Sequence, residues 1–365
     1  MSHGMPCSAG AQKSDQRLLW IGQLAVEEGA GDAIYDRKMI AACRALGTNV
    51  ECLQLRPVSR AHELANLARG VPYYRARYDS AQNHSAIAQA AKRHTRAVCS
   101  WEPLDALAAR CPIPTLPILH NVSSHALRAM YPDNRLVSLA ALRVALWERR
   151  LYGSRKFPAI VALSELDRRR VAKRAGTMRT LLAPPGMPPC TELPAEPAVR
   201  RELLLWGSFD WAPKRRDVLA FARAYERVPQ RLPVLAERLP AEAEQRLAVR
   251  PVPKTSAPAV RFGLITDRFE AGFKLKGTAY LADNAIVLSF VDLASDYAGI
   301  EDYGYFVRHL RSVEEIARHV AEVAAADPAQ LRTRFEAFKQ RCAARFSWQA
   351  SAQIVLAASE KSVLR

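Results

Sequence analysis

The sequence has 365 residues, 49% of them hydrophobic and 24% charged, which is typical of folded proteins and unlike disordered chains. A chain of this length usually forms two domains. No uncharged apolar run approaches the roughly 20 residues of a membrane-spanning helix, and residues 1–16 lack the apolar core of a secretory signal. We therefore expect a cytoplasmic protein with a disordered segment at residues 1–16.

Basic residues outnumber acidic ones by 53 to 36, which gives a net charge of +17. The excess is concentrated in residues 143–179, which hold eleven basic and three acidic side chains. Such a stretch favours anionic partners, among them an anionic membrane surface. The alternative is a helix face whose charges are simply solvated.

Motifs that bind metal ions or nucleotides through a short signature are absent from the sequence. The seven cysteines are scattered without a C-x-x-C pair, and we expect them to be reduced thiols. There is no H-E-x-x-H, P-loop, G-x-S-x-G or acidic cluster, and no G-x-G-x-x-G follows the first apolar run. A metal site and a dehydrogenase fingerprint are thus not indicated.

Short apolar runs alternate with amphipathic stretches along the first half of the chain. Strands are predicted at residues 18–21, 50–55, 97–100, 115–119 and 159–163, and helices at 33–46, 84–93, 103–109 and near 136–152. This alternation is typical of a parallel α/β sheet.

A proline-rich segment at residues 183–199 interrupts this pattern and is the best linker in the chain. Beyond it the pattern restarts with an apolar run at residues 203–206, a turn at Gly207 and a helix at residues 216–225. We therefore predict an α/β protein with two Rossmann-like domains facing each other across a cleft.

Two glycine turns of the second half are candidate phosphate sites. Gly207 follows a predicted strand and precedes a helix whose start carries Lys214, while Gly272 is followed by Lys274 and Lys276 at another helix start. Backbone N–H groups at such helix starts, together with lysines, neutralise phosphates. Most strand-to-helix turns bind nothing, so each turn could equally be a capped surface helix.

His120 and Asn121 directly follow the predicted strand at residues 115–119. The carboxyl edge of a parallel sheet is where ligands bind in α/β proteins, so this pair would face the cleft. The alternative is that His120 is an ordinary hydrogen-bonded histidine.

Five segments, taken in order, resemble GT-B glycosyltransferases and are most similar to the large family 4 of nucleotide-sugar-dependent enzymes. They are HNVSSHALRAM at residues 120–130, WERRLYGSRKFPAIVALSELD at 147–167, LLLWGSFDWAPK at 203–214, GFKLKGTAYLADNAIVL at 272–288 and RFSWQASA at 345–352. The resemblance runs from about residue 18 to residue 357.

The resemblance implies a GT-B architecture with the last helix crossing back to the first domain. The expected divisions are an acceptor domain at residues 17–185, a linker at 186–200, a donor domain at 201–345 and a crossover helix at 346–365. The family transfers sugars with retention of configuration and usually without a metal ion, and we expect no cofactor beyond the nucleotide-sugar co-substrate.

The resemblance also implies roles for individual residues. His120 and Lys276 would be catalytic. The donor would contact Gly207, Ser208, Lys214, Gly272, Phe273, Lys274, Lys276 and Thr278, and the acceptor side would consist of Gly29, Gly31, His120 and Asn121. The acidic residue with which the family binds the donor ribose is replaced by Ala279.

The predicted function is transfer of a sugar from a nucleotide-sugar donor to a carbohydrate or lipid-linked acceptor. The basic half of the chain favours a peripheral position at the inner face of the cytoplasmic membrane, and no nucleic-acid partner is expected. The alternative is a non-catalytic protein that binds nucleotide sugars or nucleic acid.

Overall fold

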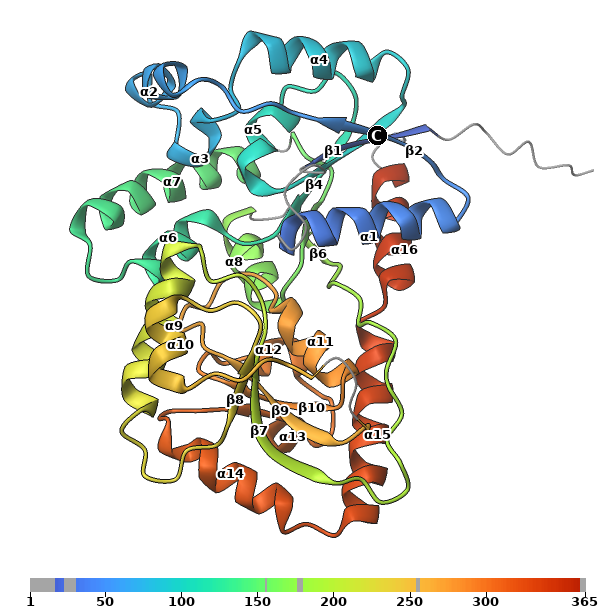
Figure 1. Ribbon diagram of the computed structural model, residues 1–365. Coiled ribbons are helices and arrows are strands. Elements are labelled where there is room, and N and C mark those ends of the chain that lie inside the picture. Colours follow the sequence, from blue (N-terminus) through green and yellow to red (C-terminus); the bar gives the residue numbers. More distant parts are fainter. Residues whose placement is uncertain (1–16, 23–30, 155, 176–179, 254–256, 362–365) are drawn as a thin grey trace, which may run out of the picture.

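The computed structural model of the chain describes residues 17–22, 31–154, 156–175, 180–253 and 257–361 (Figure 1). It contains two parallel β-sheets, one of six strands and one of five, each packed against helices. The predicted disordered segment at residues 1–16 lies outside the described residues. No helix in the described ranges is both long and apolar enough to cross a membrane.

The first sheet has the strand order β2-β1-β3-β4-β5-β6, and all neighbouring strands are parallel. Its strands are β1 (Arg17–Gly22), β2 (Asn49–Gln54), β3 (Arg96–Ser100), β4 (Thr115–Leu119), β5 (Ile160–Ala162) and β6 (Thr180–Leu182). Its helices are α1 (Gly31–Ala45), α2 (Arg60–Ala68), α3 (Tyr73–Ala76), α4 (Ala81–Ala91), η1 (Glu102–Leu104), α5 (Asp105–Ala108), α6 (Ser123–Met130), α7 (Arg135–Gly153) and α8 (Glu165–Ala175).

Strand β1 shows why the strands of the first domain are continuous apolar runs in the sequence. Leu18 and Trp20 face one apolar core, which contains residues of α1 and α16, whereas Leu19 and Ile21 face a second core against α4, α5 and α8. A strand of a parallel sheet covered on both faces is apolar throughout. The sequence-based strand predictions of this half are confirmed to within two residues, and the structure adds the short strand β6.

The second sheet has the order β11-β10-β9-β7-β8 and is also parallel throughout. Its strands are β7 (Val199–Leu205), β8 (Val234–Ala236), β9 (Val260–Ile265), β10 (Ala285–Ser289) and β11 (Val307–His309). The helices are α9 (Ala212–Tyr225), α10 (Ala241–Leu247), α11 (Leu275–Ala282), α12 (Ala294–Tyr297), α13 (Tyr303–Phe306), α14 (Glu314–Ala324) and α15 (Pro328–Arg345). The predicted helix at residues 216–225 begins earlier, at Ala212, with Pro213 in its first turn.

The last helix, α16 (Trp348–Lys361), leaves the second domain after α15 and packs against α1 of the first domain (Figure 1). Ala352 and Val355 of α16 are fully buried in the first-domain core. The chain therefore crosses back to the first domain at its C-terminal helix, as expected from the resemblance.

The two domains meet where the carboxyl ends of both sheets face each other. Hydrogen bonds between backbone and side-chain groups join them there. Two backbone N–H groups donate to carboxylates, Gly272 to Asp167 Oδ2 at 3.0 Å and Glu165 to Asp296 Oδ1 at 2.8 Å. Two arginines donate to backbone carbonyls, Arg170 to that of Glu270 at 3.0 Å and Arg216 to that of Met130. These contacts hold α8 and the end of α6 in the first domain against the segment at residues 270–272, α12 and α9 of the second.

Candidate functional site

The site is built from residues that directly follow buried strands in both domains. On the first-domain side, His120 directly follows β4, and Asp32 lies in the first turn of α1. On the second-domain side, β9 leads into Thr266 and Asp267, and β7 into Gly207. This arrangement follows from parallel topology, because the carboxyl ends of all strands of a sheet lie at one edge.

His120 is 6% exposed, and both of its ring nitrogens have partners. Nδ1 lies 2.9 Å from Asp32 Oδ1, and Nε2 lies 3.0 Å from Ser100 Oγ. Burial alone would lower the pKa of His120, but the hydrogen bond and charge of Asp32 outweigh it and raise the pKa to about 9. The imidazole is therefore cationic at neutral pH, and the half-exposed Asp32 carboxylate is its counterion.

Glu102 lies behind this pair and accepts a hydrogen bond from the His120 backbone N–H at 3.3 Å. Its side chain is buried, and burial raises its pKa to about 7, with a further contribution from Asp32. A buried carboxyl at this position holds the backbone that presents His120 and adds to the negative potential around the imidazole.

Lys274 and Asp267 form an ion pair on the second-domain side, with Nζ 3.3 Å from Oδ2. The ammonium of Lys274 also lies 4.2 Å from the centre of the Phe269 ring. Burial would raise the pKa of Asp267, but the charges of Lys274 and Lys276 lower it. Lys274 is thus already neutralised by a carboxylate.

Lys276 is partly buried and has no ion pair with any carboxylate in the described part of the chain. Its side chain lies over Gly207, where an added Cβ would be 2.9 Å from Nζ, and its ammonium is 4.5 Å from the centre of the Phe209 ring. Burial lowers the pKa of Lys276 to about 8. The charge of Asp267 opposes this effect, and the like charges of Lys214 and Lys274 add to it. An anionic ligand at this point would remove the cost of leaving the cation unpaired.

Lys214 is a further cation without a carboxylate partner among the described residues. It lies in the first turn of α9, with Nζ 6.0 Å from the centre of the Trp211 ring. Its charge lowers the pKa of both Asp32 and Asp267. The charge of Lys214 therefore acts on carboxylates of both domains.

Two oxygens at the end of β9 are buried without a hydrogen-bond partner in the ranges that the structure describes. These atoms are Thr266 Oγ1 and Asp267 Oδ1, in residues that are 1% and 3% exposed. Buried polar atoms almost always have a partner in the functional state of a protein. The end of β9 therefore has capacity for a ligand hydroxyl group or a bound water molecule.

The structure also places the other residues predicted for the site. Gly272 has φ +64° and packs so closely against the His120 carbonyl that an added Cβ would be 2.8 Å from it, and Asn121 lies beside it. Gly31 lies against Leu275 of the second domain. Gly29 lies outside the described residues.

Three residues predicted to contact the donor have partners of their own within the protein. Ser208 is exposed and donates to Asp210 Oδ2 at 2.8 Å. The Thr278 hydroxyl is buried and donates to the Leu275 carbonyl within its own helix, and Phe273 packs edge-on against Phe346. Their participation in donor binding stays a prediction, as do the roles of the other site residues.

Sequence reasoning missed Asp32, Glu102 and Asp267. Asp267 could have been found by the pattern that identified His120, because both are polar residues just after a predicted or observed buried strand. Asp32 and Glu102 reach the site only through contacts between distant parts of the chain, which no local pattern reports. No group of three His, Cys, Asp or Glu side chains in the described ranges could hold a metal ion.

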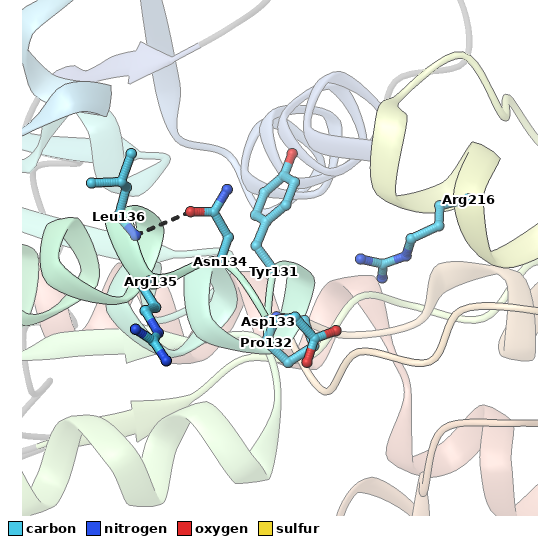
Figure 2. Close-up of a pocket in the computed structure, with 7 residues that line it drawn as sticks. All are labelled: Tyr131, Pro132, Asp133, Asn134, Arg135, Leu136 and Arg216. Carbon is cyan, nitrogen blue, oxygen red and sulfur yellow. Dashed lines mark hydrogen bonds between the residues drawn. The ribbon is translucent and has the colours of Figure 1, made fainter.

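A separate pocket of about 410 Å³ lies where the loop between α6 and α7 faces α9 (Figure 2). Arg216 of α9 points toward this loop from across the pocket, and Asn134 caps α7 by accepting from the Leu136 N–H at 3.1 Å. The pocket is lined by Tyr131, Pro132, Asp133, Asn134, Arg135, Leu136 and Arg216. None of these residues belongs to the His120 and lysine site.

No model of a protein family matches the chain, and no curated protein matches it significantly. Solved structures do. A sucrose-phosphate synthase from Thermosynechococcus elongatus is 14% identical, with a TM-score of 0.62 over 95% of this chain and 98% of that one. The apo form of the lipopolysaccharide outer core galactosyltransferase WaaB is 12% identical, with a TM-score of 0.54 over 93% and 100%.

The chain has a two-domain, Rossmann-like GT-B fold. The N-terminal domain of a Candida albicans trehalose-6-phosphate phosphatase is similar as well, at 10% identity and a TM-score of 0.54 over 96% of this chain and 98% of that one. At these identities the likeness establishes the GT-B fold and not the reaction. The resemblance to family 4 in particular stays a prediction.

Proposed function

We propose that this GT-B protein transfers a sugar from a nucleotide-sugar donor, bound by the second domain, to an acceptor bound by the first. The observation that carries the proposal is Lys276, a partly buried cation that lies against Gly207 without a carboxylate partner in the described part of the chain. Together with Lys214 and the start of α11, it forms a cationic site at the carboxyl edge of the second sheet. Diphosphates bind at such edges.

The same cations supply the chemistry that sugar transfer requires. The bond between the sugar and the diphosphate breaks with negative charge developing on the diphosphate oxygen. Lys276 and Lys214 would stabilise that charge, because neither forms an ion pair with a carboxylate among the described residues. We propose that no metal ion is needed and that the configuration of the sugar is retained.

His120 and Asp32 would face the sugar and the acceptor. As a cation, His120 can only donate hydrogen bonds, and Ser100 and Asp32 occupy both ring nitrogens. The half-exposed Asp32 carboxylate is therefore the group of the pair with free capacity to accept a hydrogen bond from a hydroxyl. The class of acceptor, carbohydrate or lipid-linked, and the cytoplasmic location stay predictions.

The test is release of the nucleoside diphosphate from UDP-, GDP-, ADP- and dTDP-sugars, with simple glycosides and polyprenyl phosphates as acceptors. We expect turnover of at least one donor, loss of turnover in Lys276→Ala, and no change in Lys156→Ala, which removes an exposed lysine just before β5. Proton NMR of the product would show the anomeric configuration. Binding of a donor without any release of diphosphate would favour the alternative, a non-catalytic nucleotide-sugar-binding protein.

A further inference from the structure

Helix α7 carries an unusual apolar surface. Seven large hydrophobic side chains are prominently exposed among the described residues, and four of them are leucines of this one helix. The exposed fractions are 79% for Leu136, 66% for Leu139, 48% for Leu142 and 52% for Leu146. Their spacing of three or four residues places them along one side of the helix. We call these four residues the leucine face.

The opposite side of α7 packs on the first domain through smaller residues. Ala141 and Val144 are buried there, with Glu148 and Tyr152 further along the helix. The packing of this side therefore fixes which face of α7 is exposed. Figure 1 shows α7 at the outer side of the first domain, with α16 on the opposite side.

Cationic side chains accompany the leucine face. Arg135, Arg143, Arg149 and Arg150 are all exposed residues of α7, and none has an ion pair with a carboxylate in the part of the chain that is described. Helical geometry places Arg143 and Arg149 on either side of the leucines.

Helix α8 holds the other cluster of cations in the basic stretch, and its arginines are engaged. Arg168 and Arg169 bind Glu165 at 2.7 and 2.8 Å, and Arg174 binds the buried Glu148. Arg170 lies 3.5 Å from both Asp167 and Glu270. The unpaired arginines of these two helices are thus on α7, while α8 contributes only Lys173 as an exposed cation without an ion pair in the described ranges.

We propose that the leucine face and the arginines of α7 form a docking surface for an anionic lipid bilayer, on which α7 lies parallel to the membrane plane. Leucines would enter the boundary between headgroups and acyl chains, and the guanidinium groups would bind lipid phosphates. This combination on one helix is the pattern of interfacial helices. The proposal concerns a partner of the protein and holds independently of glycosyl transfer.

Charge distinguishes the bilayer from the other candidate occupants. A second copy of the chain would bring the same unpaired arginines together across a two-fold axis, and their repulsion opposes that pairing. Nucleic acid would leave the leucines without a partner, because single strands stack on aromatic side chains and duplexes bind mainly through phosphates. An anionic bilayer satisfies both the apolar and the cationic groups.

The pocket of Figure 2 opens at the N-terminal end of this surface, because Arg135 and Leu136 belong to both. Docking through the leucine face would place the pocket near the lipid headgroups.

The test is flotation of the full-length protein with vesicles of phosphatidylglycerol and phosphatidylcholine in equal parts at 100 mM salt, compared with phosphatidylcholine alone. We expect binding to the anionic vesicles only. Leu139→Glu/Leu146→Glu should lower the partition coefficient tenfold or more, whereas Ile354→Glu, a matched change on α16 at a residue 36% exposed, should leave it unchanged. Melting temperatures of the variants would confirm that they fold.

A second set of variants tests the contribution of the arginines to vesicle binding. Each arginine near an anionic surface is worth about 1 kcal/mol, or roughly fivefold in binding. Arg149→Gln/Arg150→Gln should therefore weaken vesicle binding at least fivefold, and Arg37→Gln/Lys38→Gln, an adjacent exposed pair on α1, should have a smaller effect.

Several results would overturn the proposal. One is that the protein does not bind anionic vesicles, or that it binds phosphatidylcholine vesicles as strongly as anionic ones. Another is that the leucine variants bind anionic vesicles as strongly as the wild type, or that duplex DNA or RNA displaces the protein from the vesicles. A wild-type dimer that the leucine changes convert to a monomer would assign the face to a second copy of the chain. No sugar donor enters this assay, so its failure would leave the proposed transfer activity untouched.

Discussion

Lys276 makes the donor affinity of this protein depend on pH in a way that can be calculated. The pKa of Lys276 is lowered to about 8, chiefly by burial. The ammonium is then about 90% protonated at pH 7 and about 10% at pH 9. Since only the cation attracts the diphosphate, the affinity for a nucleotide sugar should fall roughly tenfold between these values, with the loss centred on pH 8.

Two variants isolate Lys276 from other titrating groups, including His120, whose pKa is about 9. Lys276→Arg keeps its charge over the whole range, so its affinity should change much less between pH 7 and pH 9. Lys276→Ala removes a charge-assisted hydrogen bond worth about 1.5–3 kcal/mol, which corresponds to a tenfold or greater loss at pH 7.

The assay is isothermal titration calorimetry with a nucleotide sugar, whose diphosphate does not titrate in this range. Lys274→Ala should weaken binding less than Lys276→Ala, because Lys274 is already paired with Asp267. The reasoning would be refuted by a wild-type affinity that is equal at pH 7 and pH 9. It would also be refuted by a Lys276→Arg variant that loses affinity as steeply as the wild type.

Three further predictions concern metal dependence, stability and pH. Turnover should survive saturating EDTA, and rescue of a lost activity by magnesium or manganese would contradict a metal-free mechanism. Arg75 and Asp105 form a buried ion pair, and each side chain is 1% exposed. Arg75→Met should therefore lower the free energy of unfolding, measured in urea, by about 3–5 kcal/mol, because it leaves the Asp105 carboxylate buried without its partner. A loss below about 1 kcal/mol would contradict the presence of this ion pair. Burial raises the pKa of Asp296 to about 7, so ionisation of this group in the unfolded chain destabilises the fold as pH rises toward 7. Asp296→Asn, whose side-chain oxygen can still accept from the Glu165 N–H, should therefore raise the melting temperature at pH 8 more than at pH 5. Equal shifts at the two pH values would contradict this.

The fold could be predicted from the sequence because both sheets are parallel and buried. Strands covered on both faces are short, continuous apolar runs, such as residues 18–21, and they stand out against their amphipathic neighbours. The proline-rich segment at residues 183–199 likewise separates β6 from β7. Short helices such as α3 and α12 were not predicted, because four residues carry no recognisable periodicity.

The candidate site was only partly predictable, because its electrostatics arise from pairs of residues far apart in the chain. Asp32 and His120 are 88 residues apart, yet their contact decides that the imidazole is cationic. In the same way, the sequence presented Lys274 and Lys276 as equivalent, and only the fold shows that Asp267 neutralises Lys274.

The exposure of the leucine face could not be predicted from the sequence. The leucines of α7 recur with helical spacing, which normally indicates the side of a helix that packs on the core. In the structure the smaller residues Ala141 and Val144 fill that place, and the leucines are exposed. Which side of an amphipathic helix is buried depends on the partner surface, which the local sequence does not contain.

We propose that a nucleotide sugar binds at the carboxyl edge of the second sheet with its diphosphate on Lys276. The most direct measurement is calorimetric titration of the wild type, Lys276→Ala and Lys156→Ala with UDP-, GDP-, ADP- and dTDP-glucose at pH 7. The account predicts that at least one of these donors binds the wild type and Lys156→Ala equally, and Lys276→Ala at least tenfold more weakly. Binding of none of them, or equal binding by Lys276→Ala, would contradict it.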